Sequence, residues 1–458
     1  MHGRRRHGKS ILLRTLCEIS GGMYHQAIEG TESDQLRDLG QTYARQLGLP
    51  VAPAFTDWEQ AVDALLALGG DAPVPVVLDE FPYLVAGAVG LPSRLQRALD
   101  ARRGRGPRCR LILCGSAMTV MPALLAGQAP LRGRASSELA VGPFSFPDAA
   151  RFAGLAGDAR LAIAVHAVCG GVPGYYVDML AGDVPADADD FDAWMIRGPL
   201  NPTRPLLHEA RHLLDDEPRV RDKAVLLSVL AAIAGGDTTS GAIAGRLGRD
   251  AATVAHPLSV LADMHLVARR EDALRAKRPN WQITDPLLRL YAAVMRRDWA
   301  RLEQGRAREV WRDAEPVWRS RVLGPHLEQL ARDWATDHAA ELVPAGMSRV
   351  GSAVLTDAAQ RSSHEIDIVG LGIPGTVAPV VLLGEVKHQR QPMSAAGLDR
   401  LRRIRDLLDR QGKASPDTRL LLVSASGFTP ELEALHRAGE VLLAAPENLL
   451  STPIPAPP

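Results

Sequence analysis

The chain has 458 residues, 46% of them hydrophobic, which is sufficient for about three domains with packed cores. Its 53 Lys and Arg balance its 53 Asp and Glu, so global charge gives no support for non-specific nucleic-acid binding. No apolar run approaches the roughly 18 residues of a membrane-spanning helix, and the four cysteines form no metal-binding or disulfide pattern. We therefore expect a soluble cytoplasmic protein with no membrane partner.

The chain opens on a glycine-rich loop, Gly3-Arg4-Arg5-Arg6-His7-Gly8-Lys9-Ser10, which matches the phosphate-binding P-loop pattern. Gly3 and Gly8 let the backbone curl so that its N–H groups point at a triphosphate. Lys9 would reach the β- and γ-phosphates, and Ser10, in the first turn of a helix, would hold Mg²⁺. The alternative is a chance Gly/Arg-rich loop. Because only five of the 53 basic residues are lysines, the sequence favours a specific role for Lys9.

An apolar stretch that ends in two acids, Val74–Glu80, supplies the second half of a nucleotide site. Asp79 would bind Mg²⁺, usually through water, and Glu80 would be the general base that polarises the attacking water. A buried strand ending at a turn explains the apolar run but not the two adjacent carboxylates. The next apolar strand is followed by Ser116, which can sense the γ-phosphate or orient the water.

Strands and helices alternate through this first part of the chain, which predicts an α/β fold with a parallel sheet. The expected strands are 23–28, 74–80 and 110–114, and the expected helices are 10–18, 34–47, 58–68 and 91–102. A P-loop normally follows a central strand, but only two residues precede Gly3, so the first strand is missing from this sequence. We therefore expect the natural product to begin upstream.

Two later motifs each have a functional and a structural interpretation. Arg134 follows the last core strand, where an arginine can neutralise transition-state charge; a solvated loop arginine is the alternative. The turn over 170–176 can wrap an adenine base through backbone and aromatic contacts, or it can form a corner between helices. We assign residues 1–150 to the P-loop core and residues 151–215 to a helical lid.

Three helices and two short strands predict a winged helix-turn-helix domain over residues 216–300. Its recognition helix, from residue 250 to 264, carries alanines and a proline where Arg, Lys, Asn or Gln would read bases. The basic residues of the wing can still meet DNA phosphates without sequence preference; they are Arg269, Arg270, Arg275, Lys277 and Arg278. A structural or protein-docking wing is the alternative.

The last domain, over residues 301–450, carries acids at the ends of two predicted strands. Asp367 belongs to the first strand, and Glu385-Val386-Lys387 ends the second. This is the layout of metal-dependent phosphodiester cleavage: Asp367 and Glu385 hold Mg²⁺, while Lys387 orients or deprotonates water. Alternation puts Glu385 and Lys387 on one face of the strand. The proline-rich residues 451–458 are expected to form a disordered tail.

The ordered motifs GRRRHGKS, LDEFPYL, LCGSAMTVM, PLRGR and GGVPGYY resemble the prokaryotic archaeal-type ATPases of the AAA/STAND group. The resemblance implies an ATP-binding core, a lid with a GxP motif, and a winged helix behind it. The residues matched to the family are Lys9, Ser10, Asp79, Glu80, Gly171 and Pro173. The chain departs from the family by lacking an N-terminal F-x-G-R-E helix.

The C-terminal segment resembles the PD-(D/E)XK nuclease superfamily, with Gly384-Glu385-Val386-Lys387 in the place of its G-E-x-K motif. The resemblance implies an αβββαβ core with Asp367, Glu385 and Lys387 as catalytic residues. It also implies Glu328 as a ligand from the first helix, and Mg²⁺ or Mn²⁺ as the metal. A nuclease fold whose acids are merely structural is the alternative.

Two functions are consistent with these motifs. The first is an ATP-hydrolysing protein that acts on DNA and cuts it through the last domain. The second is a nucleotide-dependent regulator or scaffold that binds ATP and never cleaves. Either protein could form a homo-oligomer or dock a protein partner through the winged helix.

Overall fold

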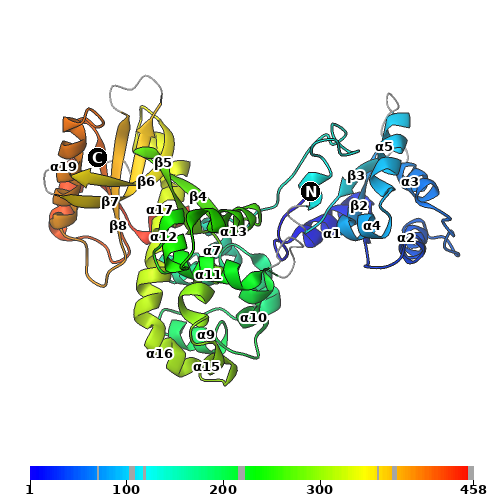
Figure 1. Ribbon diagram of the computed structural model, residues 1–458, viewed down its shortest axis with the longest axis horizontal. Helices are drawn as coiled ribbons and strands as arrows, with labels where there is room; N and C mark the ends of the chain where they lie inside the picture. The colour runs from blue at the N-terminus through cyan, green and yellow to red at the C-terminus, as the bar shows by residue number, and fades with distance from the viewer. Residues whose placement is uncertain are drawn as a thin grey trace. The chain divides into compact units, whose positions relative to one another are not determined.

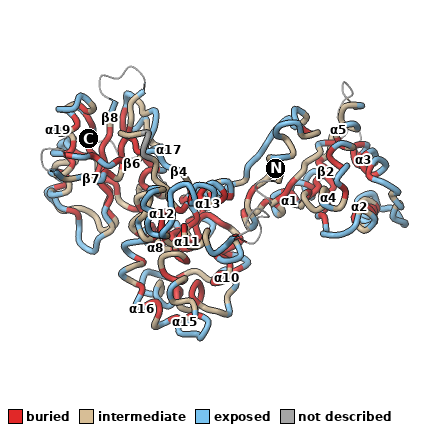
Figure 2. Tube along the Cα trace, viewed as in Figure 1, coloured by how far each residue is buried: buried red, intermediate tan, exposed pale blue. Residues whose placement is uncertain are grey.

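The computed structural model describes residues 1–69, 72–102, 109–116, 120–214, 222–357, 361–373 and 379–451. The chain divides into two compact units, which we call unit 1 (residues 1–143) and unit 2 (from residue 144 onward) (Figure 1). Each unit has a buried interior of its own (Figure 2). The division falls after residue 143, and the domain boundaries predicted at residues 150, 215 and 300 stay predictions.

Unit 1 is a parallel three-stranded sheet with helices, as predicted. Its strands are β1 (Met23–Gln26), β2 (Val74–Asp79) and β3 (Cys109–Leu113), in the order β1-β2-β3. Its helices are α1 (Lys9–Ser20), α2 (Glu32–Leu47), α3 (Trp58–Leu66), α4 (Phe81–Gly87), α5 (Leu91–Ala101) and α6 (Val120–Ala123). The central strand β2 is buried from Pro75 to Asp79, because parallel strands are covered on both faces.

Local sequence explains where the helices of unit 1 begin. Asp57 caps α3 by accepting hydrogen bonds from the backbone N–H groups of Glu59 and Gln60. Thr31 caps α2 in the same way through the N–H of Asp34. These side chains satisfy donors that the first turn of a helix leaves without a partner.

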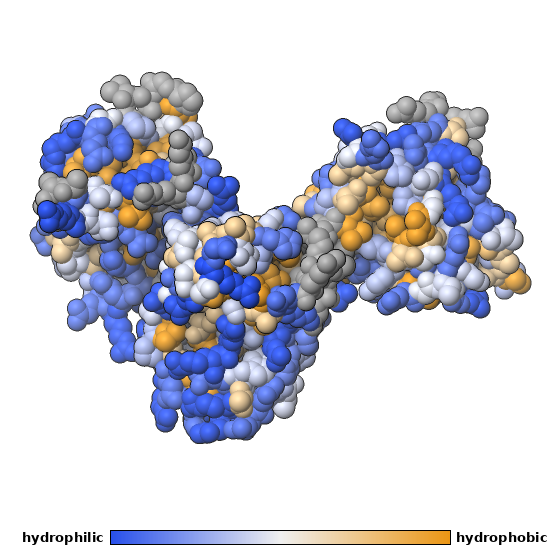
Figure 3. All heavy atoms as spheres, in the orientation of Figure 1, coloured by the Kyte–Doolittle hydropathy of each residue, from blue (hydrophilic) through white to orange (hydrophobic). Residues whose placement is uncertain are grey.

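Helix α1 lies on the sheet through Leu13 and Cys17, which are buried together with Val77 of β2. Apolar side chains elsewhere on this helix are exposed, including Ile11 and Ile19. Figure 3 shows apolar atoms at the surface of each unit among more hydrophilic ones. The packing of α1 on β2 brings the P-loop to the end of the strand that carries Asp79.

The residues that precede the P-loop extend this sheet. The amino group of Met1 donates to the carbonyl of Leu113 at 2.8 Å. His2 forms parallel bridges with Gly115 on one side and with Ala140 on the other. The backbone of His2 therefore lies beside the end of β3, next to the position at which the P-loop begins.

The first half of unit 2 is mostly helical. It begins with α7 (Phe146–Phe152), α8 (Ala159–Cys169), the π-helix η1 (Tyr175–Met179), α9 (Phe191–Arg197) and α10 (Pro205–His212). The elements predicted for a winged helix-turn-helix follow: α11 (Lys223–Ala234), α12 (Ser240–Arg246), α13 (Ala251–Asp263) and the antiparallel hairpin of β4 (Val267–Asp272) and β5 (Arg275–Ile283). Next come α14 (Pro286–Leu290), η2 (Tyr291–Met295), α15 (Trp299–Glu303), α16 (Ala307–Val317) and η3 (Trp318–Leu323).

The second half of unit 2 contains a mixed five-stranded sheet in the order β10-β9-β8-β7-β6. Its strands are β6 (Met347–Asp357), β7 (Ser362–Gly372), β8 (Val380–Lys387), β9 (Arg419–Ser424) and β10 (Leu442–Ala444). Its helices are α17 (Gly324–Asp337), α18 (Ala339–Leu342), α19 (Ala395–Arg410), α20 (Pro430–Arg437) and α21 (Pro446–Ser451). Strands β6, β7 and β8 are antiparallel, whereas β8, β9 and β10 are parallel. Ser451, predicted to begin the tail, ends a helix, and residues 452–458 of that tail lie outside the described residues.

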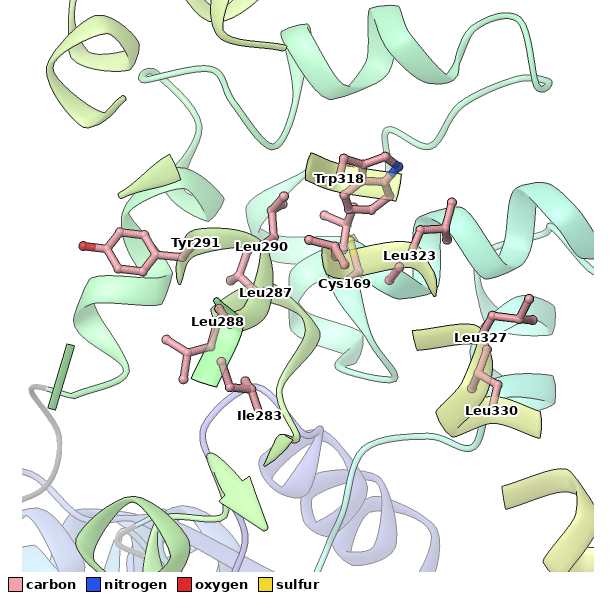
Figure 4. Close-up of a cluster of buried hydrophobic side chains, with 14 of the residues drawn as sticks. Cys169, Ile283, Leu287, Leu288, Leu290, Tyr291, Trp318, Leu323, Leu327 and Leu330 are labelled. Atoms are coloured by element: carbon pink, nitrogen blue, oxygen red, sulfur yellow. The ribbon is translucent and has the colours of Figure 1, made fainter. Parts of the chain in front are cut away.

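A large hydrophobic core runs through unit 2 from Phe146 to Leu449, and a second one lies between the C-terminal sheet and α19. Figure 4 shows part of it, where Cys169 of α8, Leu287 of α14, Trp318 of η3 and Leu327 of α17 lie together. Helices α8 and α17 are also joined by the buried pair of His166 and His326, whose ring nitrogens are 2.9 Å apart. The large core therefore joins the helical first half of unit 2 to the C-terminal sheet.

Candidate functional site

The P-loop turns into α1 at Gly8, which has a left-handed backbone with φ of 85°. A side chain at Gly3 would collide with the carbonyl of Val141, so both glycines of the motif are required by the backbone. Lys9 is buried, and its Nζ donates to the carbonyls of Gly3 at 2.7 Å and Arg4 at 2.8 Å. Burial lowers the pKa of Lys9. The ammonium is thus held by neutral oxygens inside its own loop.

The acid at the end of β2 lies directly against the P-loop. Ser10 Oγ donates to Asp79 Oδ2 at 2.6 Å, and Tyr24 Oη on β1 donates to the same oxygen at 2.6 Å. Burial acts to raise the pKa of Asp79, but the hydrogen bonds from Ser10 and Tyr24 lower it below its usual value. Burial and the bond to Asp79 raise the pKa of Tyr24 to about 12. Tyr24 was not predicted as a site residue, because it comes beside Asp79 only through the register of β1 and β2.

Glu80, the proposed general base, lies directly before α4 and has a left-handed backbone with φ of 51°. Such a conformation is uncommon for a residue with a side chain and is concentrated at functional sites. Ser116 Oγ after β3 donates to both carboxylate oxygens of Glu80, at 3.1 and 3.3 Å. The structure therefore brings together four of the predicted residues, which are Ser10, Asp79, Glu80 and Ser116.

The donor set of Ser10 and Asp79 fits Mg²⁺. This ion prefers oxygen ligands and usually takes one or two protein groups together with phosphates and waters. Asp79 is in direct contact with neutral hydroxyl groups, which can move aside or share the carboxylate. Lys9 stands nearby, where its charge would face the phosphates that such an ion accompanies.

Two of the residues predicted to contact nucleotide, Arg134 and Gly171, are hydrogen-bonded to other parts of the chain. Arg134 donates through Nε and Nη2 to the two oxygens of Asp100 on α5, at 3.1 and 2.8 Å. Gly171 accepts a hydrogen bond from the N–H of Phe144 at 2.7 Å. Pro173 precedes η1, whose residues Tyr175 and Tyr176 are buried in the core of unit 2. These contacts favour the structural interpretations of both motifs, and a contact of any of the three residues with nucleotide stays a prediction.

The three acids of the last domain each have a partner within the chain. Asp367 Oδ2 accepts from the N–H of Val386 at 2.8 Å. The carboxylate of Glu385 pairs with Lys387 at 2.6 Å and with Arg400 of α19. In the part of the chain that the structure describes, no three His, Cys, Asp or Glu side chains are grouped so as to hold a metal ion. Glu385 and Lys387 do share one face of β8, as their contact requires.

Glu328 projects from α17 beside Arg332, with 3.8 Å between the charged atoms. Arg332 also donates to the carbonyl of Asp367 at 3.0 Å. Burial, reinforced by the nearby charge of Asp367, raises the pKa of Glu328 to about 7. The pKa of Asp367 is raised by burial as well. Metal binding by Glu328, Asp367 and Glu385, and catalysis by Lys387, stay predictions.

The hairpin of β4 and β5, predicted to be a wing, packs on the C-terminal sheet of the same chain. The N–H of Ala273, at its turn, donates to Ser352 O of β6 at 2.9 Å, and Asp272 accepts from the N–H of Val354 at 2.8 Å. Arg275, predicted to meet phosphates, instead donates to Thr356 at 3.1 Å. These contacts favour the structural interpretation of the hairpin, because β6 of the same chain receives it.

Other basic residues of the wing differ from Arg275. Arg269 and Arg270 are exposed, whereas the side chains of Lys277 and Arg278 lie outside the described residues. The exposed residues of α13 near its start are Ala251, Ala252, Thr253, Ala255 and His256. As expected from the sequence, this surface offers few groups that could read base edges.

No helix among the described residues combines the length and the apolar character that a membrane span requires. No family model matches the chain, and no curated protein matches it in sequence.

Several solved structures are similar to parts of the chain. A Walker-type ATPase of Pyrococcus abyssi shares 18% identity over 64% of this chain and 89% of its own, with a TM-score of 0.44. The Aeropyrum pernix ORC1 protein, solved in complex with DNA, shares 18% identity over 66% of this chain and 87% of its own, with a TM-score of 0.28. A Vibrio cholerae protein shares 10% identity over 98% and 94% of the two chains, with a TM-score of 0.23. These values are too low to assign the chain to a family.

Proposed function

We propose that the chain binds ATP with Mg²⁺ at the P-loop of unit 1 and hydrolyses it. The observation that carries this proposal is the 2.6 Å hydrogen bond between Ser10 Oγ and Asp79 Oδ2, which joins the phosphate-binding loop to the acid of β2. The P-loop and the acids at the end of β2 are more than sixty residues apart in the chain. A chance Gly/Arg-rich loop would not be expected to place its serine against one of those acids.

Each residue of the site has a separate role in this proposal. Lys9 exchanges its two carbonyl partners for the β- and γ-phosphates, and the N-terminus of α1 favours the same negative charge. Ser10 and Asp79 hold Mg²⁺, which neutralises charge on the phosphates. Glu80, oriented by Ser116, accepts a proton from the attacking water.

Replacement of Lys9 tests the proposal. Lys9→Ala should weaken ATP binding at least about 100-fold, because two charge-assisted hydrogen bonds of about 1.5–3 kcal/mol each are lost. Isothermal titration with a slowly hydrolysed ATP analogue and Mg²⁺ measures the change. Lys223→Ala, at an exposed lysine of α11, is the matched control and should bind as the parent does. Equal affinity in the Lys9→Ala chain and the parent would exclude a P-loop site.

The sequence left two functions open, a nuclease driven by ATP and a nucleotide-dependent regulator or scaffold. The contacts of Glu385 favour the regulator or scaffold. Glu385 already pairs with Lys387 and Arg400, so it is not free to take a metal ion. DNA is the partner that we propose for this unit, with the exposed Arg269 and Arg270 meeting phosphates. Anisotropy of labelled duplex DNA, with and without ATP, measures binding, and incubation of plasmid with Mg²⁺ or Mn²⁺ measures cleavage. No ATP-dependent binding would contradict the DNA proposal, and metal-dependent cleavage would contradict the regulator.

A further inference from the structure

Strands β7 and β8 separate from each other where the acids of the C-terminal domain lie. Their backbone pairing runs from Leu371 opposite Val380 to Ile368 opposite Gly384, and no pair beyond these is formed between the two strands as the structure describes them. Past that point, side chains take over the hydrogen bonds. The carboxylate of Asp367 accepts from the N–H of Val386 at 2.8 Å. The fork between the strands is thus closed by side chains rather than by a ladder.

Arg400 fastens the same fork from the helix that covers it. It comes from the first half of α19, and its Nη2 donates to the carbonyl of Glu365 on β7 at 2.5 Å. Its Nη1 contacts Oε2 of Glu385 on β8. One guanidinium therefore bridges both strands at the place where their own pairing ends. A rigid fork of donors is suited to such a bridge, because it can bind two acceptors at once.

Glu385 has cations on both of its oxygens. Lys387 Nζ lies 2.6 Å from Oε1, and Arg400 occupies Oε2. The Glu385 side chain is only 2% exposed, whereas the side chains of Lys387 and Arg400 are 48% and 30% exposed. The acid is thus buried beneath its two partners. An ion arriving from solvent would have to displace one of them to reach an oxygen.

The residues present do not fit a divalent metal at this acid. Metal binding needs carboxylate oxygens that are available to the ion. Arg400 cannot yield its place by losing a proton, because a guanidinium stays charged in proteins. If a metal ion displaced Arg400, the guanidinium charge would remain close to the ion and would have lost its ion pair with Glu385. Glu328 and Asp367 offer no preformed alternative, since Arg332 and the N–H of Val386 already engage them.

We propose that Arg400 takes the place of a divalent cation at Glu385, so that the Glu385-Val386-Lys387 segment is a metal-free ion-pair site that holds β7, β8 and α19 together. In this proposal Arg400 has a structural role, and its contact with Glu385 keeps a metal ion away from that acid. This inference does not rest on ATP binding, so it can fail while the ATP proposal holds. It shares the contacts of Glu385 with the preference for a regulator over a nuclease.

The test counts Mn²⁺ ions bound to the full chain without nucleotide. Every variant also carries Asp79→Asn, which removes the acid proposed to hold metal at the P-loop. Electron paramagnetic resonance of free Mn²⁺ during titration gives the number bound. We expect Glu385→Gln to leave that number unchanged, because Glu385 binds no metal while Arg400 is present. We expect Arg400→Gln to add about one bound Mn²⁺ per chain, and a further Glu385→Gln change to remove it.

Arg402→Gln is the matched control, because Arg402 lies on the same helix and pairs with Asp399 and Glu440 instead of Glu385. It should add no Mn²⁺. Loss of a bound ion on Glu385→Gln while Arg400 is intact would overturn the proposal. So would an Arg400→Gln chain that folds and gains no ion, because Arg400 would then not be what keeps the metal out.

A melting experiment keeps the proposal testable if Arg400→Gln does not fold. The difference in Tm between the parent and Glu385→Gln should be the same in EDTA and in Mn²⁺, since the ion pairs need no metal. A Tm gain in Mn²⁺ that Glu385→Gln abolishes would show a metal at this acid and overturn the proposal.

Discussion

The P-loop site of unit 1 and the Glu385 site of unit 2 both place a buried acid at the end of a strand. Their surroundings differ. Asp79 accepts hydrogen bonds from two neutral hydroxyls, whereas Glu385 contacts two cations. A hydroxyl can share the acid with an incoming ion, but a guanidinium brings its own permanent charge. The first acid is therefore prepared for a ligand from outside the chain, and the second is neutralised by the chain itself.

The lysines of the two sites show the same difference. Lys9 donates to backbone carbonyls, while Lys387 contacts a carboxylate. Moving Lys9 onto a phosphate exchanges neutral acceptors for charged ones, which strengthens its hydrogen bonds. Moving Lys387 onto a ligand would break an ion pair beside a buried acid, and a buried charge without a partner is costly. The presence of a conspicuous lysine is therefore not sufficient evidence of a ligand site.

The largest effect that would separate the two sites is loss of hydrolysis at Glu80. Glu80→Gln should keep ATP binding and slow hydrolysis by about 10²–10⁴-fold, because the amide cannot accept the proton of the attacking water. Phosphate release and ATP-analogue titration measure the two quantities separately. Glu59→Gln, at an exposed acid of the same unit, should change neither. Normal turnover in the Glu80→Gln chain would mean that another group is the base.

A smaller effect should follow from replacing Tyr24. Its neutral hydroxyl contacts Asp79, whereas the partners of Glu385 are cations. Tyr24→Phe removes the 2.6 Å hydrogen bond to Asp79 and should weaken Mg²⁺-dependent ATP binding by about tenfold, the equivalent of about 1.4 kcal/mol. Binding measured without Mg²⁺ should change less, because the hydroxyl acts through the metal-binding acid. An equal loss with and without Mg²⁺ would indicate a general packing defect instead. Tyr43→Phe, on α2, is the control for removal of a hydroxyl.

The smallest expected effect concerns Glu328, whose pKa is raised from 4.5 to about 7 by burial first and then by Asp367. Between these values the folded chain holds a proton that the unfolded chain has lost, so stability should fall as pH rises from about 4.5 to about 7. Glu328→Gln removes this titration and should flatten that part of the Tm profile, which amounts to about a few degrees.

Exposed Glu341→Gln on α18 is the control for Glu328→Gln and should leave the profile unchanged. An unchanged slope in the Glu328→Gln chain would mean that its carboxylate is solvated, like that of an exposed acid.

Much of the fold and of the site of unit 1 could be predicted from short-range sequence patterns. The P-loop, the two acids at the end of β2, the alternation of strands and helices, and the meeting of Ser10 with Asp79 were all predictable. A phosphate-binding loop works through consecutive backbone groups and the first turn of one helix, so its chemistry is written in adjacent residues. Parallel strands also end at one edge of a sheet, which brings Ser116 to Glu80.

The sequence by itself therefore determined the local chemistry: which loop can bind phosphate, which strand ends carry acids, and that Glu385 and Lys387 share a face. Only the tertiary structure decided what each charged group meets. In the folded chain Tyr24 contacts Asp79, Arg134 contacts Asp100, and Arg400 contacts Glu385. The β4–β5 hairpin contacts β6. The physical reason is that these partners lie far apart in the chain or on different elements. Strand register and helix packing bring them together, and no local residue pattern encodes either.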